Sequence, residues 1–253
     1  MKSTSAKLLF GLLLALAGPA LADEVQVAVA ANFMAPMKTI AADFEKDTGH
    51  KAVLAFGTVG KFYAQIHNGA PFEVMVASDE ETPAKLARDG LALGDTRYVY
   101  AIGKLVLWSS MPGFVDGGGE VLKKGDFRHL ALANPKLAVY GAAGMEVMKR
   151  LGVLPALESK FVLAENITQA HMFVSSGTAE LGFVAYSQVA GKDGSGIASG
   201  SAWMVPQEFY SPIRQDVIVL AKGKDNPAAI SLASYLKTPK AKAVIRSFGY
   251  DLP

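Results

Sequence analysis

Short apolar runs alternate with longer amphipathic stretches from residue 25 to the C-terminus. Apolar runs of about four to eight residues predict buried strands, and apolar side chains every three or four residues predict helices. The predicted strands are 25–30, 52–56, 72–77, 103–108, 130–133, 181–185 and 216–221. The predicted helices are 34–48, 60–68, 82–89, 144–151, 168–176, 226–236 and 239–248. This alternation is typical of α/β proteins with largely parallel sheets.

The first 22 residues have the pattern of an export signal. Lys2 and Lys7 precede an apolar run from Leu8 to Leu16, and Ala20-Leu21-Ala22 is a small-x-small cleavage site. The alternative, a membrane anchor, is disfavoured because the run is shorter than the roughly 20 residues that span a bilayer. We therefore expect residues 1–22 to be a signal peptide and the mature chain to begin at Asp23.

The amino-acid composition limits the compartments in which the protein can act and the kinds of partner that it can bind. The sequence contains no cysteine, which excludes disulfides, thiolate chemistry and a lipid anchor on cysteine. An exported, untethered protein that serves the cell envelope is expected in the periplasm. The formal net charge of +2 includes Lys2 and Lys7, so the mature chain is formally neutral, with its charges dispersed. Nucleic-acid binding therefore has no support.

Four turns could hold an anion, because in each an apolar or extended run ends in small or polar residues that open a helix. In open parallel sheets such turns gather at the carboxyl ends of the strands, where ligands bind. Helix starts present unpaired N–H groups and the positive end of the helix dipole, so they bind anions without lysine or arginine. Gly57, Gly60, Gly141 and Gly144 would let the backbone approach the ligand. Taken singly, these turns also fit any α/β protein. The turns are Ala30-Ala31-Asn32-Phe33, Gly57-Thr58-Val59-Gly60-Lys61, Tyr140-Gly141-Ala142-Ala143-Gly144 and Glu165-Asn166-Ile167-Thr168.

Seven segments, in this order and spacing, resemble the periplasmic molybdate-binding proteins of ABC transporters over nearly the whole mature chain. The segments are Ala28-Val29-Ala30-Ala31-Asn32-Phe33, Gly57–Gly60 with Phe62–Ile66, Asn68-Gly69-Ala70-Pro71, Ser78-Asp79-Glu80, Gly103–Trp108, Asn134-Pro135 with Tyr140-Gly141, and Gly182-Phe183-Val184.

The resemblance implies an α/β fold of the type II periplasmic binding proteins, with two lobes that enclose the ligand. Each lobe would hold a mainly parallel sheet flanked by helices. The first lobe would comprise residues 23–102 and 208–253, and the second lobe residues 103–207.

The resemblance also implies the ligand-binding residues, which would be Asn32, Thr58, Val59, Tyr140 and Ile167. Many relatives have serine at the positions of Asn32 and Val59. Here Asn32 would offer its amide, and Val59 its backbone N–H beside the Thr58 hydroxyl. Some relatives have a ligand-binding tyrosine at the position of Ala185.

The function implied is capture of molybdate, and of tungstate, for delivery to the membrane permease of an ABC transporter. A tetrahedral dianion has only acceptor oxygens, so a site made of N–H, hydroxyl and amide donors satisfies it without a countercharge. Under this reading the protein is a monomer and not an enzyme, with no cofactor and no metal cation.

Two alternatives remain at this point. The first keeps the fold but replaces the ligand with another small oxyanion such as sulfate. The second is an exported hydrolase, although no Gly-x-Ser-x-Gly or His-Glu-x-x-His motif is present. The four histidines, His50, His67, His129 and His171, are scattered along the sequence.

Overall fold

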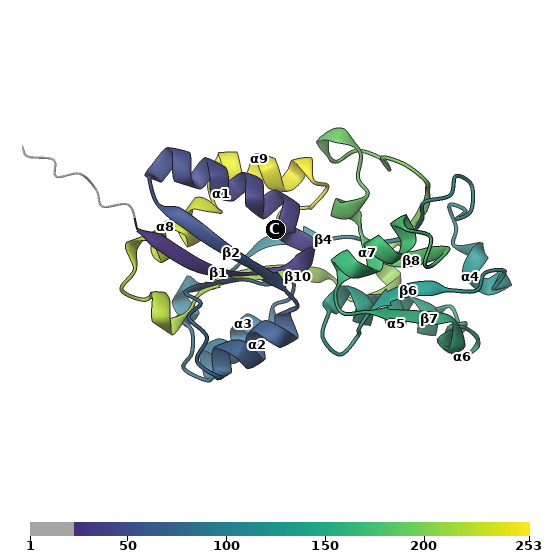
Figure 1. Ribbon diagram of the computed structural model, residues 1–253, viewed down its shortest axis with the longest axis horizontal. Helices are drawn as coiled ribbons and strands as arrows, with labels where there is room; N and C mark the ends of the chain where they lie inside the picture. The colour runs from purple at the N-terminus through teal and green to yellow at the C-terminus, as the bar shows by residue number, and fades with distance from the viewer. Residues whose placement is uncertain (1–22) are drawn as a thin grey trace, which may run out of the picture.

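The computed structural model describes residues 23–253, which form two lobes side by side along the long axis of the molecule (Figure 1). The predicted signal peptide, residues 1–22, lies outside this range. None of the helices within it combines the length and the apolar character needed to cross a bilayer.

The first lobe contains a mixed five-stranded sheet. The β2–β1 and β1–β3 pairs are parallel, and the β3–β10 and β10–β4 pairs are antiparallel. In spatial order the strands are β2 (Lys51–Gly57), β1 (Glu24–Ala30), β3 (Val74–Val76), β10 (Ile213–Val219) and β4 (Tyr98–Gly103).

The second lobe repeats this pattern of directions. The β7–β6 and β6–β8 pairs are parallel, and the β8–β5 and β5–β9 pairs are antiparallel. The order is β7 (Phe161–Ala164), β6 (Leu130–Ala133), β8 (Leu181–Ala185), β5 (Leu105–Ser109) and β9 (Ser201–Met204). Both sheets are therefore mixed, and the parallel strands of each form one side of the sheet.

Helices cover the sheets and complete the cores. In the first lobe, α1, α8 and α9 contribute to one apolar cluster, and α2 and α3 to a second (Figure 1). In the second lobe, α5 and α7 pack on the sheet. The helices are α1 (Met34–Thr48), α2 (Val59–His67), α3 (Glu81–Arg88), α4 (Glu120–Lys124), α5 (Val139–Arg150), α6 (Leu154–Leu157), α7 (Ile167–Ser175), α8 (Pro227–Tyr235) and α9 (Pro239–Ser247).

The chain crosses between the lobes twice. One residue, Lys104, separates β4 from β5, and residues 205–212 connect β9 to β10. Both crossings are short, and they lie where a hinge between the lobes would operate.

The predicted elements match the observed ones with two kinds of exception. Strands β4, β7 and β9 were not predicted, because their runs are short or rich in polar and aromatic residues. Helices α4 and α6, of five and four residues, were not predicted either, because they are too short to show a helical periodicity. Helix α5 begins at Val139, five residues before its predicted start at Gly144. Gly141 and Gly144 resemble loop residues in the sequence, but they lie inside α5 and allow this helix to pack closely against the sheet.

A buried carboxylate lies in β10 at a register shift between Gln215 and Asp216. Asp216 is 1% exposed, and the Nε of Arg97 lies 3.2 Å from its Oδ2. Within residues 23–253 the contact with Arg97 is an ion pair, and neither carboxylate oxygen accepts a hydrogen bond. Burial raises the pKa of Asp216 to about 6, against the opposing effect of Arg97.

We expect Asp216→Asn to stabilise the fold by about 2 kcal/mol at pH 8. A carboxyl group with a raised pKa in the folded state penalises folding once it ionises, so the gain should shrink as the pH falls from 6 toward 4. Urea unfolding of both proteins at pH 8 and pH 5 measures the effect. A loss of stability at both pH values would instead mean that the Arg97 ion pair dominates.

Candidate functional site

The four predicted turns meet at one cavity between the lobes. The closed cavity measures about 10 Å³, close to the volume that holds a single water molecule and far below the roughly 300 Å³ of a typical organic-ligand site. Each lobe contributes two of the turns. The lining residues are Ala31, Asn32, Gly57, Thr58, Val59, Ser78, Ala138, Val139, Tyr140, Asn166 and Ile167.

All five residues predicted to bind the ligand line this cavity. Val59, Tyr140 and Ile167 lie in the first turns of α2, α5 and α7, and Asn32 lies in the 3₁₀ turn (Ala31–Phe33) that leads into α1. Within residues 23–253, no acceptor is found for the backbone N–H of any of these four residues. Helix starts from both lobes therefore direct free amides and positive dipole ends toward one cavity.

Side-chain donors supplement the amides. Thr58 caps α2, and its Oγ1 accepts from the N–H of Lys61 at 3.3 Å, which leaves the hydroxyl proton free. Asn166 caps α7 in the same way, accepting from the N–H of Gln169 at 3.0 Å and keeping both amide hydrogens. The Ser78 hydroxyl has no hydrogen-bond partner in the described part of the chain, and this side chain is 5% exposed.

The side-chain amide of Asn32 is not free, in contrast to the sequence expectation. Its Nδ2 donates to Gln215 Oε1 and to the Tyr250 hydroxyl, each at 3.0 Å. An asparagine amide has two hydrogens, so both are used. Asn32 can therefore face the cavity as a donor only through its backbone N–H.

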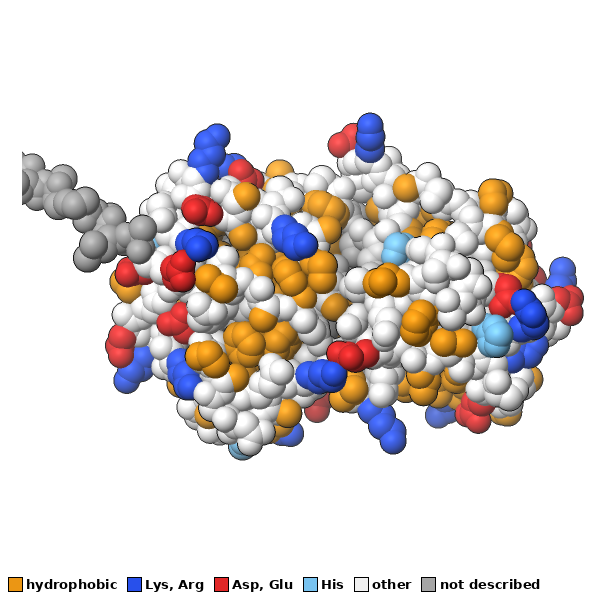
Figure 2. Space-filling model, in the orientation of Figure 1, with side chains coloured by type: hydrophobic (Ala, Val, Ile, Leu, Met, Phe, Trp, Pro, Cys, Tyr) orange, Lys and Arg blue, Asp and Glu red, His pale blue; other side chains and the backbone are white. Residues whose placement is uncertain are grey.

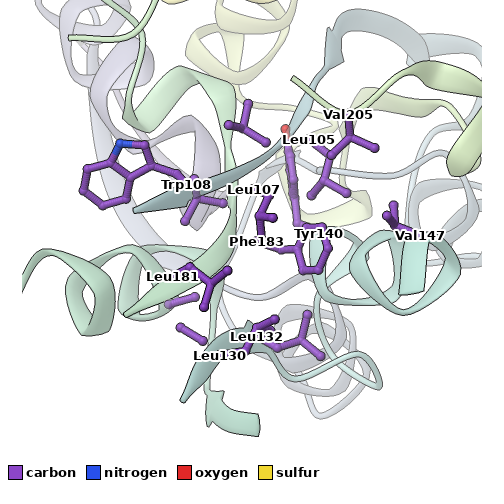
Figure 3. Close-up of a cluster of buried hydrophobic side chains, with 14 of the residues drawn as sticks. Leu105, Leu107, Trp108, Leu130, Leu132, Tyr140, Val147, Leu181, Phe183 and Val205 are labelled. Carbon is purple, nitrogen blue, oxygen red and sulfur yellow. The ribbon is translucent and has the colours of Figure 1, made fainter. Parts of the chain in front are cut away.

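The phenol of Tyr140 also points elsewhere. Its hydroxyl accepts from Gln215 Nε2 at 3.1 Å and lies against Gly103 at the crossing between the lobes. In Figure 3 its oxygen points away from Leu130 and Leu132 in the core of the second lobe. Burial raises the pKa of Tyr140 well above its ordinary value, so the group stays a neutral phenol.

This buried network joins the lobes behind the cavity. Ser187, in the second lobe, donates to the Tyr250 hydroxyl at 2.9 Å. Tyr250, near the C-terminus, donates to the backbone oxygen of Asn32 at 2.8 Å. Tyr100 donates to Gln215 Oε1 at 3.0 Å. The lobes are thus held together by side-chain hydrogen bonds, from Gln215 to Tyr140 and from Ser187 to Tyr250, directly beside the predicted binding turns.

Gly141 and Gly144 do not have the predicted role. They lie inside α5, where a Cβ on Gly141 would collide with the Ala133 carbonyl and one on Gly144 would come within 2.8 Å of Leu132. These glycines allow the helix to approach β6, and they do not bring the backbone to a ligand. Gly60 does lie at the interface, where a Cβ would be 3.3 Å from Leu137 of the other lobe.

The cavity is electrostatically neutral apart from its dipoles. None of its lining residues is Asp, Glu, His, Lys or Arg. Glu165, the first residue of the fourth turn, pairs with Lys61 at 2.7 Å and does not line the cavity. Among residues 23–253 no cluster of three or more His, Asp or Glu could hold a metal cation.

The lobes are closed over the cavity. Thr168 of the second lobe donates to the Ala31 carbonyl of the first at 3.2 Å. A larger groove of about 340 Å³ shares Val59, Ala138 and Val139 with the cavity and opens to the surface between the lobes. On the face in Figure 2 the two lobes touch along a shallow seam. A ligand in the cavity would therefore be largely enclosed.

Three lining residues, Ser78, Ala138 and Val139, lie outside the four turns predicted from the sequence. Ser78 follows the end of a parallel strand, as the predicted turns do, but the strand does not lead directly into a helix. Val139 was missed because the start of α5 was placed too late. Asn166 was recognised as part of a turn, and its capping geometry in the structure shows that its amide hydrogens are available.

Comparisons with known proteins agree with this architecture. A family model described as a bacterial extracellular solute-binding protein matches residues 25–251. Molybdate-binding protein ModA of Azotobacter vinelandii is 59% identical over 237 residues, covering 94% of this chain and 93% of that protein. The protein of the same name from Rhodobacter capsulatus is 50% identical over 239 residues, covering 94% and 92%.

The solved structure of the Azotobacter vinelandii periplasmic molybdate-binding protein superposes with a TM-score of 0.87 at 42% identity, covering 90% of this chain and 99% of that one. This match confirms the predicted two-lobe fold. The sulfate-binding protein SubI of Mycobacterium tuberculosis shares the fold at 13% identity and a TM-score of 0.72. The chain therefore belongs to the family of bacterial extracellular solute-binding proteins, within which it falls among the ModA proteins.

Proposed function

We propose that this protein captures molybdate, and tungstate of similar shape, and delivers it to the membrane permease of an ABC transporter. The observation that carries the proposal is the uncharged cavity at which four helix starts from two lobes present free N–H groups. A dianion bound there would receive hydrogen bonds from both lobes at once. The names of the similar ModA proteins support molybdate as the ion.

The donors favour a fully deprotonated oxyanion. Monoprotonated phosphate carries one donor and needs an acceptor, and no carboxylate lines the cavity. Sulfate has the same hydrogen-bonding character as molybdate but is smaller, so the size of the closed cavity would separate them. The bound ion would be held by the backbone N–H groups of Asn32, Val59, Tyr140 and Ile167. The hydroxyls of Thr58 and Ser78 and the side-chain amide of Asn166 would donate further hydrogen bonds.

Capture would proceed by hinge closure. The ion would enter an open form, and contacts to both lobes would then shift the population toward the closed form. The permease would recognise the closed shape. We further propose that the protein acts in the periplasm as a monomer after removal of residues 1–22, and that it binds its ligand without catalysis.

A panel of oxyanions tests the proposal on the mature chain. Molybdate and tungstate at a thousandfold excess over Kd should stabilise the folded state by about 4 kcal/mol, which raises Tm by roughly 10 °C. Phosphate should leave Tm unchanged, and sulfate should have a smaller effect than molybdate. Stabilisation by sulfate or phosphate greater than that by molybdate would reject the proposal.

Two conservative variants separate residues that face the ion from residues that face the hinge. Ser78→Ala removes a free hydroxyl from the cavity and should weaken molybdate binding by about 1.5 kcal/mol, roughly tenfold. Tyr140→Phe keeps the backbone N–H and should leave affinity within about threefold, while lowering stability by about 1 kcal/mol because Gln215 loses an acceptor. Calorimetric titration and urea unfolding measure both effects. The opposite ranking of the two affinities would place the Tyr140 phenol, and not Ser78, at the ion.

A further inference from the structure

One ion pair crosses between the lobes beside the cavity. The Nζ of Lys61, on α2 of the first lobe, lies 2.7 Å from Oε1 of Glu165, in the turn before α7 of the second lobe. Lys61 follows cavity residues Thr58 and Val59 closely, and Glu165 directly precedes cavity residue Asn166. The pair therefore joins two of the turns that would hold the ion.

Both backbones are fixed by capping interactions. The N–H of Lys61 donates to the hydroxyl of Thr58 at 3.3 Å. The N–H of Glu165 donates to Gln169 Oε1 at 2.6 Å, and Gln169 in turn donates to the capping Asn166. The two charged side chains thus start from rigid turns, and their contact requires the lobes to be closed.

Glu165 brings a negative charge next to a cavity that would enclose a dianion. Asp79, which also adjoins a cavity residue, differs because its carboxylate accepts two hydrogen bonds from Thr82, at 2.9 and 3.1 Å, and burial raises its pKa. Glu165 is 51% exposed and its ionic partner is Lys61. Among the described side chains, Lys61 is the cation that offsets this charge.

As an isolated ion pair the contact would matter little, because exposed pairs contribute about 0.2–1 kcal/mol. Its position changes its effect. A carboxylate left unpaired beside a bound dianion repels it, and like charges brought together at an interface are strongly unfavourable. The lysine therefore has a larger effect on anion binding than on folding.

We propose that Lys61 is a positioning residue for anion capture, which neutralises Glu165 only when the lobes close and so removes a repulsive charge as the ion is enclosed. This inference rests on the proposed oxyanion-binding function. It predicts that the two residues of the ion pair differ in their effect on anion binding. Loss of the lysine should harm binding, whereas loss of the glutamate should not.

Calorimetric titration of molybdate into the mature protein and three variants tests this asymmetry. At low ionic strength Lys61→Met should bind about tenfold more weakly, and Glu165→Gln should stay within about threefold of the unmodified protein. The double variant should bind as Glu165→Gln does, because no unpaired carboxylate remains. The deficit of Lys61→Met should shrink at high salt, since screening weakens the repulsion.

Two control variants accompany the test. Lys51→Met breaks the Lys51–Glu24 pair, which has a similar length of 2.9 Å and similar exposure but lies within the first lobe, and it should bind normally. Lys61→Arg keeps the charge and should also bind normally. The Tm of each unliganded variant should match that of the unmodified protein, which excludes a folding defect.

The remaining outcomes overturn the inference. Equal losses of molybdate affinity in Lys61→Met and Glu165→Gln would mean that the pair only holds the lobes closed and does not change the charge near the ion. No loss in either variant would mean that the pair does not participate in capture. If the unmodified protein and Lys51→Met both fail to bind molybdate, it is the proposed function that fails, so the two failures are distinguishable.

Discussion

The structure depends on one electrostatic constraint, which is how to bury an anion without a countercharge. An ion removed from water loses strong hydration, so each of its oxygens must find donors inside the protein. Helix starts supply these donors at fixed positions, and their dipoles add favourable potential. In the described part of this chain the N–H groups of Asn32, Val59, Tyr140 and Ile167 have no acceptor, and all four residues line the same cavity. No single helix could surround an ion, so the site requires two lobes.

The repeated sheet topology explains how four helix starts come together. In each lobe, two parallel strands end in a turn that opens a helix, and the carboxyl ends of those strands face the partner lobe. The antiparallel strands β10 and β5 belong to the part of each sheet where the chain crosses. The hydrogen bonds from Gln215 to Tyr140 and from Ser187 to Tyr250 hold the lobes together there. One side of each sheet thus builds the site, and the other side connects the lobes.

Much of this arrangement could be predicted from the sequence, because apolar periodicity and turn residues are local signals. The four turns were found in this way, and resemblance to a family selected one residue or more in each. The directions of buried side chains could not be predicted. The Asn32 amide bonds to Gln215 and Tyr250, which are distant in sequence, so no local pattern reveals that its hydrogens are used. The same holds for Gly141, whose helical position follows from packing against Ala133.

The place of β10 in the first sheet has a consequence for how the chain folds. This strand lies between β3 and β4, yet it follows the entire second lobe in sequence. Until it arrives, β4 has no neighbour in its sheet, so the first lobe cannot be completed by the segment that begins it. Pairing over such long separations is slow, because the entropy of loop closure opposes it. The first lobe is therefore finished last, and a nascent chain stays incompletely folded until its C-terminal part is available.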